Sequence, residues 1–275
     1  ECYNDSEFNN PVVFGKTLII SGQVTDAVHG ILLKAAAGHS FRDHPDAASN
    51  PLRYDVTKGV GINKTGAYDQ TVGVETDNVT LLGLQIAQTG GGNSVKCFHS
   101  NDSALTGLVV DSCIMEGNSF GSVNQGIMFI RAGLAKNNLV INRGSTGFGI
   151  TSPYPNSGTR IVSNTIVNVS DKTNPASGIG NGSGATITIR NNAVFGYASF
   201  CQNTALASGS HNASDKTIEF GSNNLPSLVY ADQFVSTADA TRDFRLKAGS
   251  ALINAGTEDL ANIPEGTDIV GKARS

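Results

Sequence analysis

The sequence predicts an all-β chain made of stacked coils, and three observations support this fold class. Asn138, Asn164 and Asn192 recur at steps of 26 (164 minus 138) and 28 (192 minus 164) residues, each between two short runs of β-forming residues. Apolar residues hold fixed positions relative to these asparagines. Polar loops of variable length separate the runs. A fixed period of about 20–50 residues is typical of a stacked-repeat architecture.

Apolar columns extend the repeat along the chain. Aligning Leu84, Cys113 and Asn223 with the three asparagines gives steps of 29, 25, 26, 28 and 31 residues by subtraction of residue numbers. The positions two residues after and three residues before this column are apolar in every coil. Strands with alternating side chains bury their inward face only when coils stack in parallel. The two columns contain Ile86, Met115, Val140, Ile166, Val194 and Leu225, and Leu81, Val110, Ala135, Ile161, Ile189 and Phe220.

An amide ladder is predicted at the aligned column. The short side chain of Asn tolerates the left-handed backbone conformation of a bend, and stacked amides can hydrogen-bond from coil to coil. The predicted ladder residues are Asn138, Asn164, Asn192 and Asn223. Two positions before the column, Asp111 and Lys136 lie in successive coils and are expected to form an ion pair of small value at the surface.

The chain is expected to form one continuous unit with three parts. Residues 1–58 are the least regular and are predicted to be opening coils or a cap, with strand-like runs at 16–22 and 31–38, of which the second is also compatible with a helical turn. Residues 59–225 are predicted to be the stacked coils. Residues 226–275 are predicted to cover the last coil, because a solenoid needs its end protected.

Composition limits the classes of partner. Charged residues are 15% of the 275, the net charge is −4, and the basic residues are scattered, which argues against nucleic-acid binding. No run approaches the ~20 apolar residues of a membrane span. The chain begins at Glu1 without Met or a signal peptide, which indicates a fragment, a mature product or part of a longer protein.

The four cysteines form no CxxC pair and match no zinc-site spacing. The favoured interpretation is that they are small buried hydrophobes. A disulfide between Cys97 and Cys113 is the alternative that the sequence leaves open.

A family resemblance adds to this fold prediction. The coils from about Asn78 to Leu225 resemble right-handed parallel β-helix proteins, with the V-x-V-x-x-N-x-I coil of many phage and secreted bacterial proteins. Residues 232–237, 243–257 and 268–274 resemble the closing segment of that group, which usually carries Asp where this chain has Asn254. The resemblance implies a right-handed parallel β-helix of roughly 25–31 residues per coil, and the tail resembles a subgroup rich in phage virion proteins.

Catalytic residues are sought because many β-helix proteins cut polysaccharides. Hydrolases of this fold typically show Asp-Asp and Gly-His-Gly, whereas this chain has no Asp-Asp and its only His-Gly is His29-Gly30. Hydrolysis of a glycosidic bond needs two carboxylates that flank it. The nearest candidates are Asp111, Glu116 and Asp102, for which scattered surface carboxylates are the favoured explanation.

One local grouping has metal-ligand chemistry. His39, Asp43 and His44 lie close together in a polar loop, but their spacing is weak evidence for a metal site. A solvated loop is the favoured interpretation, so neither a metal nor a cofactor is predicted.

Two functions from different classes follow. The first is a structural surface protein of a tailed-phage virion (a decoration, fibre or spike protein) that self-associates, with a trimer favoured, and contacts other virion proteins. The alternative is a polysaccharide-degrading enzyme (a tailspike depolymerase, glycoside hydrolase or lyase) that acts on host surface glycans. The expected location is the virion surface, and a secreted bacterial protein is the alternative. An ice-binding surface is disfavoured because the outward column Leu82, Asp111, Lys136, Val162 and Arg190 is irregular.

Overall fold

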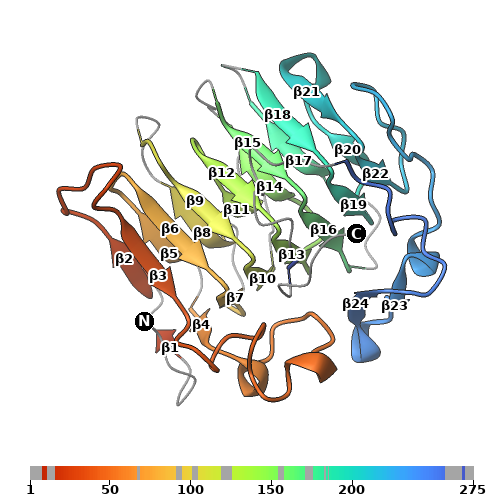
Figure 1. Cartoon of the computed structure of the whole chain (residues 1–275). Helices are drawn as coiled ribbons and strands as arrows, with labels where there is room; N and C mark the ends of the chain where they lie inside the picture. Colours follow the sequence, from red (N-terminus) through yellow and green to blue (C-terminus); the bar gives the residue numbers. More distant parts are fainter. Residues whose placement is uncertain are drawn as a thin grey trace.

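The structure is a computed structural model, and it forms a parallel β-solenoid with three sheets (Figure 1). Each strand from β1 to β19 pairs in parallel with the strand three positions further along the chain. The predicted fold class is therefore confirmed. The structure describes residues 8–10, 16–66, 69–90, 95–100, 105–118, 126–153, 158–170, 176–182, 184, 186–257 and 268–269.

The first sheet has eight strands and the other two have seven each among the described residues. The first sheet contains β1 (Phe8–Asn10), β4 (Gly61–Lys64), β7 (Gln85–Gln88), β10 (Ile114–Gly117), β13 (Leu139–Asn142), β16 (Thr165–Asn168), β19 (Ala193–Phe195) and β22 (Ala213–Ser214). The second contains β2 (Leu18–Ile20), β5 (Asp69–Val74), β8 (Val95–Ser100), β11 (Gly126–Phe129), β14 (Phe148–Ser152), β17 (Ser177–Asn181) and β20 (Ser199–Cys201). The third contains β3 (Ile31–Lys34), β6 (Val79–Leu82), β9 (Val109–Asp111), β12 (Leu134–Lys136), β15 (Arg160–Val162), β18 (Ile187–Arg190) and β21 (Ala207–Ser210).

The remaining elements are short and lie outside the coils or between them. An antiparallel pair, β23 (Phe234–Ser236) and β24 (Asp243–Leu246), follows the last coil. Helical structure in the described residues is confined to five 3-10 turns: η1 (Ala47–Ser49), η2 (Val56–Lys58), η3 (Thr204–Leu206), η4 (Tyr230–Asp232) and η5 (Asp239–Thr241). No helix in the described part of the chain is long and apolar enough to cross a membrane.

The predicted apolar columns form the interior of the solenoid. Ile86 and Met115 are paired between β7 and β10, and Val140, Ile166 and Val194 continue the same column at 0–1% exposure. The column on the third sheet likewise runs from Leu81 through Val110, Ala135 and Ile161 to Ile189. Burial of these columns removes apolar surface from water in every coil, which is the main stabilising contribution to the rod.

Both columns end earlier than the sequence alignment predicts. Val194 pairs with Ser214 and Ile189 pairs with Gly209, so Leu225 and Phe220 are not the next members. The apparent step of 31 residues spans two short coils, because β20 and β21 fall inside residues 196–212, which read as a polar loop, and β22 follows directly. Residues 217–225, which the sequence alignment places in the last coil, contribute only isolated bridges.

The predicted amide ladder lies at the bend between the third and first sheets. Each backbone N–H in the column donates to the side-chain Oδ1 of the Asn one coil further on. The distances are 2.9 Å from Cys113 to Asn138, 3.0 Å from Asn138 to Asn164 and 3.0 Å from Asn164 to Asn192. The ladder then continues to Asn212 at 3.1 Å and from Asn212 to Asn224 at 2.9 Å.

Asn223 is therefore not a ladder residue, and Asn212 is one that the alignment missed. Asn223 has φ 54°, and it belongs to a column of left-handed residues that lies one position before the ladder. The left-handed conformation is thus carried by the preceding residue rather than by the ladder Asn itself. Small polar side chains predominate in that column because they tolerate this conformation best; the column contains Ser112, Asn137, Ser163, Asn191, His211 and Asn223.

The outer face of the first sheet is also apolar. Ile114, Ile141, Val167 and Phe195 lie on it and are fully buried. The loop at residues 38–58 covers this face from one side with Phe41 and Leu52, and the C-terminal strap, which we define as residues 226–257, covers it from the other with Phe234 and Phe244. The first sheet is therefore apolar on both faces, as is typical of covered parallel sheets.

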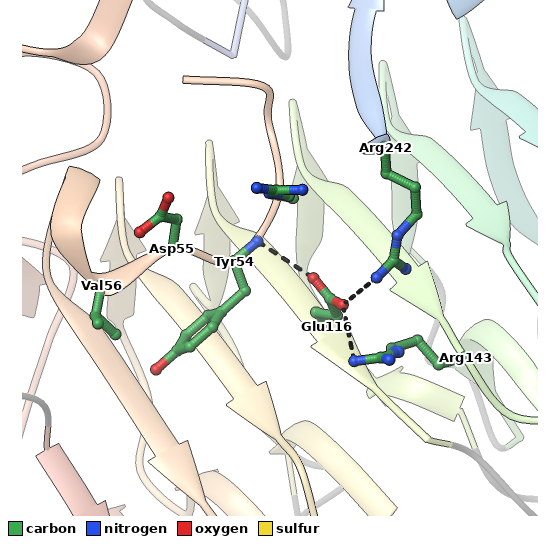
Figure 2. Close-up of a pocket in the computed structure, with 7 residues that line it drawn as sticks. Tyr54, Asp55, Val56, Glu116, Arg143 and Arg242 are labelled. Atoms are coloured by element: carbon green, nitrogen blue, oxygen red, sulfur yellow. Dashed lines mark hydrogen bonds and ion pairs between the residues drawn. The ribbon is translucent and has the colours of Figure 1, made fainter. Parts of the chain in front are cut away.

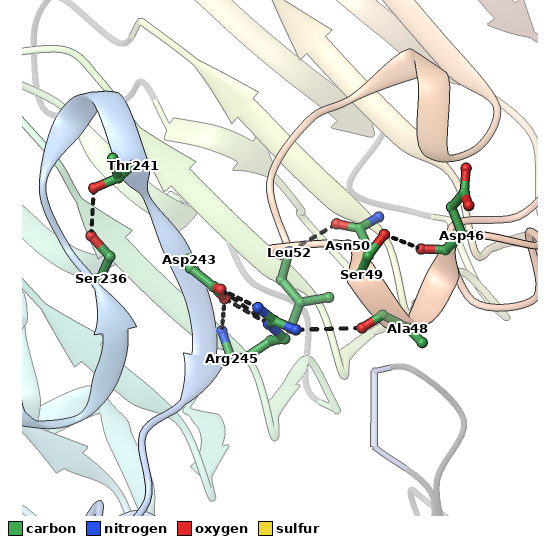
Figure 3. A network of polar contacts seen from close by, with 9 residues as sticks. All are labelled: Asp46, Ala48, Ser49, Asn50, Leu52, Ser236, Thr241, Asp243 and Arg245. Carbon is green, nitrogen blue, oxygen red and sulfur yellow. Dashed lines mark hydrogen bonds and ion pairs between the residues drawn. The ribbon is translucent and has the colours of Figure 1, made fainter.

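The C-terminal strap runs back along the solenoid instead of closing its end (Figure 1). The Phe244 N–H donates to Pro51 O at 2.9 Å, which joins the strap directly to the 38–58 loop. Arg245 extends this contact, because its Nη1 donates to Ala48 O at 3.4 Å while Nε binds Asp243 at 2.9 Å (Figure 3). The last coil is instead closed by Ile218 and Phe220, which pack on the interior column.

Candidate functional site

The carboxylates that the sequence nominates for catalysis do not converge. Asp111 lies on the third sheet, where it forms the predicted ion pair with Lys136 at 3.3 Å; both side chains are largely buried, at 16% and 9% exposed, rather than at the surface. Glu116 lies on the outer face of the first sheet. Asp102 lies outside the described residues. Asp111 and Glu116 therefore cannot flank one bond, since they lie on different sheets.

The candidate metal ligands serve the 38–58 loop instead. The Asp43 carboxylate accepts the Gly38 and Ser40 N–H groups, both at 3.0 Å. The His44 Nδ1 accepts the Asp46 N–H at 3.2 Å. Within the described ranges, no three His, Cys, Asp or Glu residues come close enough together to hold a metal ion. His39 therefore joins no such group in those ranges.

The described cysteines are free thiols inside the solenoid. Cys97, Cys113 and Cys201 are all free and buried, so the Cys97–Cys113 disulfide is not formed. Cys97 is in the second sheet, whereas Cys113 is at the bend that precedes β10. Burial raises the pKa of the Cys113 and Cys201 thiols to about 12, which makes these side chains small hydrophobes rather than nucleophiles. Cys2 lies outside the described residues.

A cavity of about 390 Å³ opens where the 38–58 loop, the first sheet and the strap meet. Tyr54 of the loop lies on one side, Glu116 and Arg143 rise from the sheet, and Arg242 comes from the strap (Figure 2). Arg53 of the loop also lines the cavity. Asp55 and Val56 complete the lining. Three segments that are distant in sequence therefore build a single site.

Glu116 is the centre of the polar network in this cavity. Its Oε1 lies 3.3 Å from Arg242 Nη2 and 3.6 Å from Arg143 Nη1, and its Oε2 accepts the Tyr54 N–H at 3.3 Å. Figure 2 shows both guanidinium groups pointing toward this carboxylate. Glu116 and Arg242 are 10% and 7% exposed, whereas Arg143 is 44% exposed. The Glu116–Arg242 pair is therefore a buried contact that fastens the strap to the sheet.

The loop beside the cavity is held firmly by Gln85. The Gln85 side chain accepts the Asp55 N–H at 2.8 Å and donates to the carbonyl oxygens of Asp55 at 2.9 Å and Gly59 at 3.0 Å. The Asp55 carboxylate accepts from Thr57 N at 2.9 Å and Thr57 Oγ1 at 2.6 Å, which caps η2. These contacts fix the position of Arg53 and Tyr54, because the chain on their C-terminal side cannot move independently.

This geometry fits anion recognition better than acid–base hydrolysis. Both oxygens of Glu116 already accept hydrogen bonds, and Asp55, the other carboxylate of the cavity, is bound by Thr57. Three guanidinium groups line the same space. Arg is the residue type best suited to bind carboxylates or phosphates through paired N–H groups.

The outer face of the second sheet carries a separate cluster. His99 and Phe129 stack edge to face with ring centroids 4.3 Å apart, while Lys96 Nζ and Arg131 Cζ lie 4.9 Å and 5.5 Å from the Phe129 centroid. Burial is the main cause that lowers the pKa of His99 to about 3, and charge repulsion from Lys96, Arg131 and Lys16 contributes to this shift. His99 is therefore a neutral imidazole near pH 7.

Sequence reasoning found Glu116 but not its partners. Arg242 lies 126 residues away from Glu116 along the chain, and no local pattern links them. Arg53 belongs to a loop whose His and Asp residues carry the more recognisable pattern, that of metal ligands. One sequence signal could have indicated these partners. The outward positions of the first sheet are apolar, so another segment of the chain must cover them; they are Ile114, Ile141, Val167 and Phe195.

The fold places the chain in the class of parallel β-solenoid proteins. Comparison with protein-family models, with curated proteins and with solved structures finds no match to this chain.

Proposed function

We propose that the protein is a rigid, non-enzymatic scaffold on the surface of a tailed-phage particle, where it acts as a decoration, fibre or spike component. The tail segments at 232–237 and 243–257 resemble virion proteins of this fold, and this resemblance supports the phage assignment. The scaffold role is supported by the amide ladder, which links successive coils through buried hydrogen bonds.

The observation that carries the proposal is that the Glu116 carboxylate is engaged in structural contacts. Of the carboxylates that the sequence nominates for catalysis, Glu116 is the one found in the cavity, and it fastens the strap through Arg242 while binding the loop through Tyr54. A carboxylate committed to three structural contacts strengthens the rod. Together with the ladder, it yields a stiff body whose parallel coils expose few strand edges.

Labelling of intact particles tests the proposal. An antibody raised against the purified chain should decorate phage particles purified from a lysate, at a repeated position in electron micrographs. A chain that is absent from purified particles and present free in the medium would overturn the virion assignment.

Self-association is part of the proposal, with a trimer favoured. Light scattering coupled to size-exclusion chromatography should give a mass near three times 28.5 kDa. A monomeric mass at every concentration would remove this element and leave the particle assignment to the labelling experiment.

A polysaccharide-degrading enzyme is the second candidate, and the cavity beside Glu116 is the observation that favours it. It predicts release of reducing ends or unsaturated products from surface glycans of the host, with loss of that activity in Glu116→Gln. Activity of this kind would replace the scaffold proposal. An unchanged rate in Asp111→Ala would be expected in that case, because Asp111 faces away on the third sheet.

A further inference from the structure

We propose that the cavity between the 38–58 loop, the first sheet and the strap binds an oxyanion, the carboxylate of an acidic sugar or a phosphate group, through Arg53 and Arg143. This site is additional to the scaffold role and does not depend on it.

The balance of charge in the cavity is the first argument. Arg53, Arg143 and Arg242 line it together with the carboxylates of Glu116 and Asp55. Glu116 is engaged by Arg242 at 3.3 Å, and Asp55 is engaged by Thr57 at 2.6 Å and 2.9 Å. The cavity therefore carries one positive charge more than its own carboxylates balance.

Donor groups remain available on two of the guanidiniums. Arg53 forms no ion pair or hydrogen bond with any residue that the structure describes, although it lines the cavity. Arg143 reaches Glu116 only at 3.6 Å through Nη1, and its side chain is 44% exposed. Each guanidinium carries five N–H donors in a planar fork, so both have donors to offer an incoming anion.

The volume of the cavity suits a small ligand. Its volume of about 390 Å³ lies at the lower end of the roughly 300–1,000 Å³ that small-molecule sites occupy. A single sugar ring or a phosphate group fits this range. Tyr54 and Val56 give one wall apolar surface, against which the carbon face of a sugar could pack.

Charge then selects among small ligands. A cation would meet three guanidinium groups, and a neutral ligand would leave the excess positive charge unbalanced in a partly enclosed site. A carboxylate or a phosphate would accept paired N–H groups from Arg53 and Arg143, which is the geometry that Arg binds most strongly. The oxyanion is therefore the class of ligand that the site fits.

Binding should also stabilise the fold. The walls come from the loop, the sheet and the strap, and these walls come together only in the native state. A ligand that binds the native state alone raises the midpoint of thermal unfolding as its concentration rises.

The test uses the whole chain with sodium glucuronate, sodium phosphate and glucose at constant ionic strength, measured by calorimetry and by thermal unfolding. Glucuronate, phosphate or both should bind saturably and raise the unfolding midpoint, whereas glucose should do neither. A response to glucuronate alone identifies the carboxylate source, and a response to phosphate alone identifies the phosphate source.

Four variants make the test specific. Arg53→Ala and Arg143→Ala should each weaken binding roughly tenfold or more, since each removes charge-assisted hydrogen bonds. Arg53→Lys keeps the charge but loses the paired donors, so its affinity should fall between those of the unaltered chain and Arg53→Ala. Arg160→Ala, an equal loss of charge on the third sheet, should bind like the unaltered chain.

The proposal is overturned by three results. These are no saturable binding of either oxyanion, unchanged binding in folded Arg53→Ala and Arg143→Ala, or an equal loss in Arg160→Ala, which would mean general charge attraction. Circular dichroism of each variant establishes that it is folded before binding is compared.

Discussion

Replacement of Asn164 by Ala should destabilise the protein more than replacement of any Asn at the end of the ladder. Asn164 Oδ1 accepts from Asn138 N and from Asn138 Nδ2, both at 3.0 Å. Asn164 Nδ2 donates to Ala135 O at 3.0 Å and to Asn192 Oδ1 at 3.0 Å. All of these groups lie in the buried column, where water cannot replace a lost partner.

The magnitude follows from the groups that lose a partner. The Ala substitution leaves the Asn138 N–H, one hydrogen of the Asn138 amide and the Ala135 carbonyl without the side chain that binds them. Each buried polar group left unsatisfied costs about 1–3 kcal/mol. Allowing for relaxation of the neighbouring coils, we expect a loss of roughly 3–6 kcal/mol in the free energy of unfolding.

Asn224 provides the matched control. It is the last ladder residue, is only half-buried, and accepts the Asn212 N–H at 2.9 Å. Water can reach this end of the ladder, so Asn224→Ala should cost about 1 kcal/mol. Urea unfolding followed by circular dichroism measures both variants; if refolding is incomplete, the unfolding rates at one urea concentration are compared instead. A cost for Asn164→Ala no larger than that for Asn224→Ala would refute the reasoning.

Three further predictions test other parts of the structure. Gly209→Ala should cost at least about 2 kcal/mol in thermal unfolding, because φ is 152° and an added Cβ would lie 1.7 Å from Ile189 O; Gly22→Ala, with open space around it, should cost less. The pKa of His99 is lowered from 6.5 to about 3, so the free energy of unfolding should be unaffected by His99 above pH 6.5 and should fall as the pH drops toward 3. The loss should reach about 3 kcal/mol at pH 4. His99→Phe should flatten this decline in acid unfolding curves. Glu116→Ala should speed tryptic cleavage after Arg242, because it leaves a buried guanidinium without its carboxylate; an unchanged cleavage rate would mean that the strap is held by its apolar contacts alone.

The regular coils could be predicted because one local rule repeats in them. A ladder Asn preceded by a small polar residue marks the bend, and inward positions at fixed offsets are apolar, as Asn137–Asn138 and Ser163–Asn164 show. The same pair occurs at His211–Asn212 and Asn223–Asn224. The steps there shorten to 20 (212 minus 192) and 12 (224 minus 212), and the alignment failed because it assumed a nearly constant coil length.

The cavity could not be predicted, because it depends on contacts between distant segments. Glu116 reads as one of several scattered carboxylates, and its environment is decided by Arg242 from the strap and Tyr54 from the loop. Neither pairing follows from periodicity, since both segments lie outside the repeat. The Asp111–Lys136 pair could be predicted for the opposite reason, because both residues occupy the same position in consecutive coils.

The cavity is a consequence of the two-sided first sheet. Ile114, Ile141, Val167 and Phe195 make its outer face apolar, and exposure of that face would be unfavourable in water. The loop and the strap together cover this face. Glu116 lies on the same face, at the point where the two segments meet. A buried carboxylate at that junction requires a cationic partner, and the cavity holds three Arg residues against the two carboxylates of Glu116 and Asp55. Arg242 alone fastens the strap to Glu116, so Arg53 and Arg143 are available at this junction for the recognition of an anion.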